Sequence, residues 1–171
     1  MSLRETPAPD VSDVEANLRW LRDREQLKML YQRYAYGVDT GDFEIVRSVF
    51  HPDCTVSGTL EDGALDPYLE GIEAGLKQWE ATMHVMGNQY VEIEGDRGHV
   101  ETWVVGYHME APESPLEHLV LGLRYLDEVV RVAADVGARL GWQIVRRNTL
   151  KQWHTGPFPR PSLGPPVYPR G

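Results

Sequence analysis

Cysteine is nearly absent from this chain. Cys54 is the one cysteine among 171 residues, so no internal disulfide can form. No CxxC motif and no Cys/His cluster offers a set of zinc ligands. A lone thiol is typical of proteins of a reducing compartment, and we expect a cytoplasmic protein with no bound metal.

Basic residues and long apolar runs are also scarce. The chain has 17 Lys and Arg against 26 Asp and Glu, a formal charge of −9. This excess repels a phosphate backbone, so we expect no nucleic-acid partner. The apolar runs are far shorter than the ~20 residues that span a bilayer, and Met1–Asp10 is polar and contains prolines, unlike a secretory signal. We therefore expect no membrane association.

The common cofactor and hydrolase motifs are missing. The sequence contains no GxGxxG, GxxxxGK[ST], GxSxG or HExxH pattern. Nothing therefore points to a dinucleotide, a nucleoside triphosphate, a hydrolase nucleophile elbow or a zinc protease. Proton chemistry without a cofactor remains, and we expect none to be bound.

The length is that of a single ordinary domain. Residues 1–11 carry two prolines without periodicity and are expected to form a flexible N-terminal arm. Residues 156–171 contain six prolines and three glycines and are expected to form a Pro-rich C-terminal tail. The folded domain is predicted over residues 12–155.

The first half of the chain has helical periodicity. Apolar residues recur three and four positions apart over Leu27–Val38, which predicts an amphipathic helix. Gly41 is expected to end this helix, and Asp42 to cap a second helix over Phe43–Phe50. A third helix is predicted over Tyr68–Thr82.

The second half of the chain is rich in β-branched and aromatic residues separated by turn signals. Four long antiparallel strands are predicted over Val85–Ile93, Val100–Met109, Leu116–Val132 and Trp142–Trp153. Helices followed by strands predict an α+β domain, in which the N-terminal helices cover one face of a curved antiparallel sheet and enclose a ligand cavity.

Asp39 is unusual because it falls in the last turn of the first predicted helix. An acidic side chain there faces the negative end of the helix dipole, which is unfavourable. One interpretation is a solvated turn, which aspartate favours through local hydrogen bonds. The other is a carboxylate at the mouth of the cavity, able to orient a histidine or to accept a proton. Both remain open on these residues alone.

His84 opens the first predicted strand, where alternation would place His84, Met86, Asn88 and Tyr90 on one face. A histidine among apolar neighbours is often only a packed core residue. Its ordinary pKa of about 6.5 nevertheless makes it the best available general base at neutral pH. His118, in the segment after the Pro112–Pro115 turn, could also reach the cavity mouth, as could His108 before it.

Two further groups offer hydrogen-bond donors. Because Arg146 and Arg147 are adjacent in a strand, only one of them can point into the concave face, and a buried arginine needs a carboxylate or a ligand. Tyr31 and Tyr34 belong to the apolar stripe of the first helix. They are either core aromatics or donors to a substrate oxygen.

Several motifs together resemble SnoaL-like domains of the NTF2-like superfamily. The resemblance covers roughly residues 20–153. It rests on the segments Arg24–Tyr31, Tyr34–Asp39, Phe50–Cys54, Thr82–Asn88, Arg124–Glu128 and Gly141–Arg147. It implies a cone in which a curved sheet and N-terminal helices surround a cavity.

Within that superfamily the sequence is similar to scytalone dehydratase, bile-acid 7α-dehydratase and hexachlorocyclohexane dehydrochlorinase. These are cofactor-independent lyases with a His–Asp pair, matched here by His84 and Asp39. Tyr34 matches a tyrosine of the bile-acid enzyme, and Arg147 matches an arginine of the dehydrochlorinase. Two departures are Tyr107, which stands where the bile-acid enzyme has a second aspartate, and an insertion over residues 133–140.

The resemblance implies a dehydratase-type β-elimination on a hydrophobic, oxygenated small molecule. Asp39 would orient His84, His84 would remove a proton, and Tyr34 with Arg147 would stabilise the oxyanion or the leaving group. Residues expected to bind the substrate are Tyr31, Asn88, Trp103, Tyr107, His118 and Tyr125.

Alternatives with the same fold stay open. They are an isomerase or cyclase, in which Asp39 alone moves a proton as in ketosteroid isomerase, a retro-aldol lyase, and a non-catalytic ligand-binding or assembly module. A homo-oligomer, either a dimer or a trimer, is expected because one face of the sheet needs cover. A hydrogen bond of about 2.6–3.2 Å between His84 and Asp39 would favour an enzyme.

Overall fold

The computed structural model describes residues 5–58, 62–132 and 141–156. The predicted insertion over residues 133–140, and the tail beyond residue 156, lie outside the described residues. The elements, in chain order, are α1 (Val14–Thr40), α2 (Phe43–Ser48), β1 (Phe50–Ser57), β2 (Gly63–Ala64), α3 (Leu65–Leu76), β3 (Ala81–Glu94), β4 (Arg97–Met109), β5 (Leu119–Arg131) and β6 (Trp142–Thr155). No helix in these ranges combines the length and the apolar character that a bilayer crossing requires.

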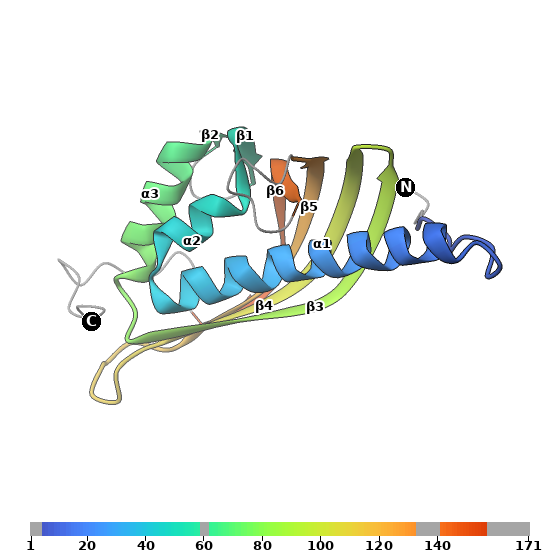
Figure 1. Ribbon diagram of the computed structural model, residues 1–171. Coiled ribbons are helices and arrows are strands. Elements are labelled where there is room, and N and C mark those ends of the chain that lie inside the picture. The colour runs from blue at the N-terminus through green and yellow to red at the C-terminus, as the bar shows by residue number, and fades with distance from the viewer. Residues whose placement is uncertain (1–4, 59–61, 133–140, 157–171) are drawn as a thin grey trace.

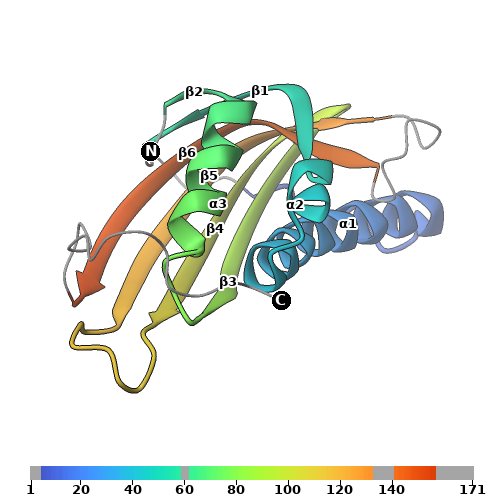
Figure 2. The ribbon, with the colours of Figure 1, turned by 90° about the vertical axis from the view of Figure 1, so that its left-hand side faces the viewer.

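The strands form one curved sheet in the order β2-β1-β6-β5-β4-β3. The strands β3 to β6 follow one another as long antiparallel neighbours, whereas β1 lies parallel to β6. The three helices lie on the concave side of the sheet, with α1 running along β3 (Figure 1 and Figure 2). The α+β architecture predicted from the sequence is therefore confirmed.

The boundary between α1 and α2 follows from two residues. Gly41 takes a left-handed conformation with φ of 74° and ends α1, as predicted. The Asp42 side chain accepts a hydrogen bond from the backbone of Ile45 at 3.1 Å and caps α2, also as predicted. These two residues set the point at which the chain leaves α1, directly after Asp39.

The third helix differs from its prediction. It spans Leu65–Leu76 rather than Tyr68–Thr82, and Thr82 lies in β3. Thr82 is paired with His108 of β4, so ladder hydrogen bonds between distant segments override the local helical pattern. The short strand β1 was not predicted, because Phe50 was assigned to the end of the second helix.

A bulge in β3 changes which side chains face inward. Met86 pairs with Val104 and Gln89 pairs with Thr102, so two residues of β3 stand opposite one residue of β4. Beyond the bulge the inner positions belong to Gln89 and Val91. The predicted alternation is therefore wrong for Asn88 and Tyr90, which do not share the inner face with His84.

The centre of the core holds a buried ion pair. Arg147 is 0% exposed, and its Nη2 donates to Asp127 Oδ2 at 2.7 Å. The hydroxyl of Tyr31 donates to the same carboxylate oxygen at 2.8 Å. Aromatic rings surround the guanidinium at 4.1–5.9 Å, from Tyr31, Tyr34, Phe50 and Tyr125. The pair thus links β6, β5 and α1 inside the cone.

A second ion pair fastens α1 to the C-terminal end of β5. Arg131 donates from both terminal nitrogens to Asp23, at 2.9 and 3.0 Å, and lies over the ring of Trp142 at 4.3 Å. Beside this end of α1, Thr6 of the N-terminal segment bonds the edge of β3, donating from its backbone to Val91 at 3.1 Å. This contact covers part of an otherwise open strand edge.

We expect Asp127→Asn to lower the free energy of unfolding by about 3–5 kcal/mol, because it leaves the Arg147 charge buried without a counter-charge. Glu128→Gln is the matched control. It removes the neighbouring carboxylate, which pairs with Arg146 at the surface, and should cost less than about 1 kcal/mol. Urea unfolding measures both variants, and equal losses would contradict the central role of the buried pair.

Candidate active site

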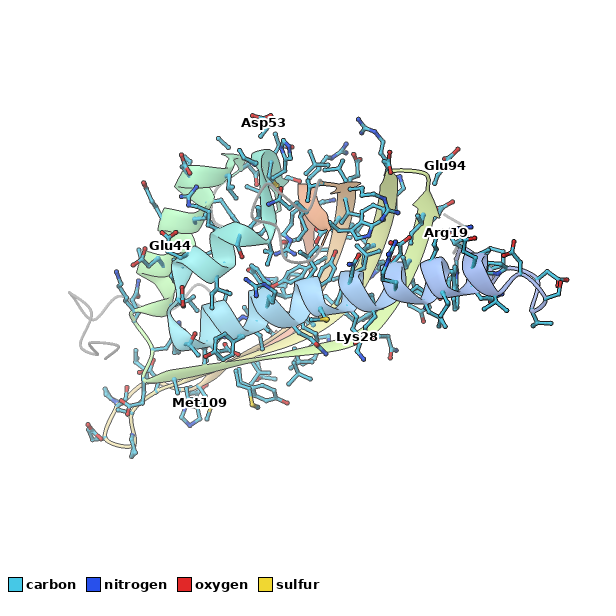
Figure 3. All side chains as sticks on the ribbon, in the orientation of Figure 1. Arg19, Lys28, Glu44, Asp53, Glu94 and Met109 are labelled. Carbon is cyan, nitrogen blue, oxygen red and sulfur yellow. The ribbon has the colours of Figure 1, made fainter. Side chains whose placement is uncertain are left out.

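The last turn of α1 carries Asp39 to the beginning of β3. The carboxylate accepts a hydrogen bond from Thr82 Oγ1 at 3.0 Å and one from the backbone N–H of His84 at 2.7 Å. Its Oδ1 also lies 2.7 Å from His84 Nδ1. The site is at the end of the molecule where β4 ends, marked by Met109 in Figure 3. One carboxylate therefore fixes both the backbone and the ring of His84.

This contact decides which nitrogen of His84 can act as a base. An ionised carboxylate only accepts hydrogen bonds, so Nδ1 must carry the hydrogen and Nε2 holds the free electron pair in the neutral ring. The side chains of His84 and Asp39 are 7% and 20% exposed. A neutral imidazole with a free Nε2, held in a shielded place, is the arrangement that a general base requires.

The charge of Asp39 is stabilised in place. Burial by itself would raise the pKa of this carboxyl group, but the hydrogen bonds and positive charge of His84, together with the Thr82 hydroxyl, outweigh it and lower the pKa. Asp39 therefore stays ionised at neutral pH. It is well suited to orient an imidazole and to stabilise the imidazolium, and poorly suited to accept a proton itself.

A second histidine lies against this pair. His108, on the inner face of β4, has its ring centroid 5.6 Å from that of His84 and 5.4 Å from Trp79. Burial, followed by the charge of His84, lowers the pKa of His108 to about 4. His108 is therefore uncharged at neutral pH. The sequence allowed His108 to reach the cavity mouth but did not predict its contact with His84, which alternation along β4 would have suggested by placing His108 on the inner face.

Gly106 makes room for both imidazoles. It stands opposite His84 in the β3–β4 ladder. A Cβ atom at this position would lie 3.3 Å from His84 Nε2 and 3.3 Å from His108 Cε1. Such contacts are tighter than a side chain normally makes. Glycine at position 106 therefore leaves the space in which the rings of His84 and His108 lie.

The other predicted catalytic residues belong to the buried group around the ion pair. The hydroxyl of Tyr34 lies 3.3 Å from that of Tyr68, and Tyr34 and Tyr125 pack on the guanidinium of Arg147. Burial raises the pKa of Tyr34 above its ordinary value, so its hydroxyl keeps its hydrogen and can donate it. Arg147, not Arg146, is the arginine that points inward.

Four predicted substrate-binding residues are not brought to the histidine pair. Alternation puts Trp103 and Tyr107 on the outer face of β4, because His108 and Thr102 take inner positions. Trp103 is 41% exposed and packs against Arg124. Asn88 is exposed at the bulge. His118 is exposed in the β4–β5 loop, where its Nδ1 accepts from the backbone of Glu110 at 2.9 Å.

Comparison with known proteins agrees with this architecture. The model of the SnoaL-like domain family matches residues 19–148. A comparison with curated protein sequences found no match. Among residues 5–58, 62–132 and 141–156, no group of three or more His, Cys, Asp or Glu side chains could hold a metal ion.

Three solved structures illustrate the likeness of fold. A putative scytalone dehydratase from Novosphingobium aromaticivorans is 23% identical, with a TM-score of 0.69 over 86% of this chain and 94% of that one. The hexachlorocyclohexane dehydrochlorinase LinA-type3 from Novosphingobium barchaimii is 16% identical, with a TM-score of 0.67 over 87% and 99%. An NTF2-like protein with a cystatin-like fold from N. aromaticivorans is 24% identical, with a TM-score of 0.59 over 84% and 90%. The NTF2-like fold expected from the sequence is thereby confirmed.

The lowered pKa of His108 predicts acid sensitivity of the fold. The ordinary pKa of a histidine is 6.5, so below this pH His108 of the unfolded chain takes up a proton. In the folded chain His108 takes up this proton only near pH 4. Stability should therefore fall as the pH falls through this window, by about 2 kcal/mol between pH 7 and pH 5 from this group. Urea unfolding at both pH values measures the loss, and His108→Leu should remove most of it. An unchanged pH dependence in the variant would contradict the assignment.

Proposed function

The chain belongs to the SnoaL-like domain family, and from that premise we propose that it is a cofactor-independent lyase acting by dehydratase-type β-elimination on a hydrophobic, oxygenated small molecule. The observation that carries the proposal is the 2.7 Å contact between His84 Nδ1 and the Asp39 carboxylate. It leaves Nε2 of His84 as a shielded base. The names of two structural relatives, a dehydratase and a dehydrochlorinase, are those of elimination reactions.

In the proposed reaction His84 Nε2 removes a proton from a carbon next to a carbonyl or another activating group. The electron pair of the broken C–H bond forms a carbon–carbon double bond, and the bond to the hydroxyl on the neighbouring carbon breaks. The imidazolium returns its proton to the departing hydroxyl, which leaves as water. Asp39 remains ionised throughout and stabilises the imidazolium. The neutral His108 adds no positive charge that would oppose this step.

Tyr34 and Arg147 are proposed to stabilise negative charge on the substrate oxygen. The buried Tyr34 hydroxyl stays protonated and is a hydrogen-bond donor. Nη1 of Arg147 is buried and has no hydrogen-bond partner among the described residues. Donors held in a low-dielectric interior stabilise developing charge more strongly than donors in water. Of the predicted binding residues, Tyr31 and Tyr125 lie in this same buried group.

The environment of Asp39 supports this mechanism over an isomerase in which Asp39 alone carries the proton. A carboxylate that accepts three hydrogen bonds and has a lowered pKa is a weak base. The same contacts make it an effective partner for a histidine. The His–Asp pair therefore supports abstraction by the imidazole.

We expect His84→Gln and Asp39→Asn each to lower the rate of elimination by about 10²–10⁴-fold, the range for a positioned acid–base group. The assay follows formation of the double bond by ultraviolet absorbance across a panel of hydroxylated ring compounds. His51 and Asp53 provide a matched control, because they form a separate His–Asp contact of 3.8 Å on β1. His51→Gln and Asp53→Asn should keep full activity. Full activity in either variant of the first pair would contradict the proposed lyase.

The outer face of the sheet supports a homo-oligomer as the working form. Met83, Val85 and Trp153 are 54%, 45% and 47% exposed on β3 and β6. The ring of Trp153 lies over Gly122 of β5 and fills the space that a Cβ atom at this position would need. Together with Trp103 these side chains form an apolar surface across the sheet that a second copy of the chain would cover.

We expect sedimentation at micromolar concentration to give a dimer or a trimer, and Val85→Glu to shift it to a monomer, because the new charge would be buried at the contact. Gln152→Glu, an equal change at an exposed position of β6, should leave the assembly intact. A monomeric wild-type protein would contradict this proposal.

A further inference from the structure

A cavity of about 380 Å³ lies between the middle of α1, from Trp20 to Gln32, and β3. Trp20, Leu21 and Lys28 of α1 line one side, and Met86 and Gln89 line the other. Figure 3 shows Lys28 on α1, well before the end that carries Asp39. At 1.5 Å per residue, Gln32, the last α1 residue of the lining, is about 10 Å from Asp39 along the helix. On β3 the lining begins at Met86, two residues from His84 on the same face. The cavity therefore adjoins the histidine pair, although neither His84 nor Asp39 lines it, and its size is that of a small-molecule site.

The bulge in β3 creates this space. Gly87 lines the cavity, and as a glycine it places no side chain there. A Cβ atom on Gly87 would lie 3.2 Å from the backbone oxygen of Trp103, which is closer than side chains normally come. The bulge also turns Gln89 inward, where its Nε2 donates to Thr102 at 3.2 Å. The bulge therefore leaves space in the β3 wall of the cavity. It also holds the Gln89 amide in a fixed position in that wall.

The N-terminal segment holds the rim in position. Trp20 Nε1 donates to the backbone oxygen of Thr6 at 3.2 Å. Arg24 Nη2 lies 2.8 Å from the Glu5 carboxylate, and the guanidinium lies over the Trp20 ring at 4.9 Å. Both rim residues are thus fixed before any ligand arrives, which lowers the entropy lost on binding.

The charges around the cavity are paired, and one buried donor, Nη1 of Arg24, has no hydrogen-bond partner among the described residues. Glu5 neutralises Arg24, and Glu25 lies 3.7 Å from Lys28. The amide of Gln32 offers both a donor and an acceptor, and the carbonyl oxygen of Gln89 is an acceptor. The lining itself carries Arg24, Lys28 and Glu25, and Glu5 outside the lining cancels the remaining positive charge, so the site with its ion-pair partners has no net charge to select an ion. Hydroxyl groups, which both donate and accept, match such a mixture, and Leu21, Met86 and Val91 supply apolar walls for a ring.

We propose that this cavity binds a neutral, polyhydroxylated ring compound of about the size of a hexopyranose. The lining contains neither His84 nor Asp39, although it shares Tyr31 with the predicted substrate-binding residues. The elimination is therefore tested by separate variants.

The test uses three probes related in structure. They are methyl β-D-glucopyranoside, the corresponding methyl β-D-glucuronide, which adds one carboxylate, and cyclohexyl methyl ether, which lacks hydroxyl groups. The readout is the ¹H–¹⁵N resonance of the Trp20 indole in the full chain, identified with Trp20→Phe. The neutral glucoside should shift this resonance saturably with a dissociation constant in the millimolar range, the scale for a ligand of this size. The other two probes should bind at least about tenfold more weakly.

Variants locate the site. Gln32→Met changes an exposed residue of α1, so the chain should fold, and it should weaken glucoside binding about three- to tenfold by removing a hydrogen bond. Gln152→Met makes the same change on β6, outside the cavity, and should leave binding unchanged, as should Asp39→Asn. Equal binding of all three probes, preference for the glucuronide, no shift of Trp20, or full binding by Gln32→Met would each overturn the proposal. None of these results would bear on the elimination chemistry, which Asp39→Asn tests separately.

Discussion

The ion pair between Arg147 and Asp127 is the interaction on which the rest of the structure depends. Two opposite charges removed from water are tolerated only if each finds good partners, and here the guanidinium and carboxylate meet at 2.7 Å with no exposure of either side chain. Tyr31 joins them from α1. Because this cluster connects α1 to β5 and β6, it restricts how the helix can lie along the concave face.

The position of α1 in turn explains why Asp39 is tolerated in the last turn of the helix. A carboxylate in the last turn of a helix faces the negative end of the helix dipole. Asp39 is stabilised there by hydrogen bonds from Thr82 and from the backbone and ring of His84, which lower its pKa despite burial. The helix end and the strand start therefore stabilise each other. The same contacts leave an imidazole with one free nitrogen in a shielded place.

The two faces of the sheet carry different kinds of side chain. Inward positions carry His84, His108 and the residues around Arg147, with Gly106 giving the two imidazoles the space they need. Outward positions carry partly exposed apolar side chains such as Val85 and Trp153. The bulge after Met86 adds a third environment, a cavity beside α1 with mixed polar lining. One irregularity in one strand thus forms a candidate binding pocket beside the candidate catalytic pair.

The sequence alone determined what is local. The end of α1 at Gly41, the cap at Asp42, the order of helices before strands and the choice of His84 with Asp39 all followed from short-range patterns and from family motifs. The pairing of strands far apart in the sequence was decided only in three dimensions. It turned Arg147 inward instead of Arg146, moved Asn88 and Tyr90 off the inner face through a bulge, and placed Trp103 and Tyr107 outside. It also brought His108 against His84. The physical reason is that side-chain period and capping act within a segment, whereas strand register and bulges are set by hydrogen bonds and packing between segments.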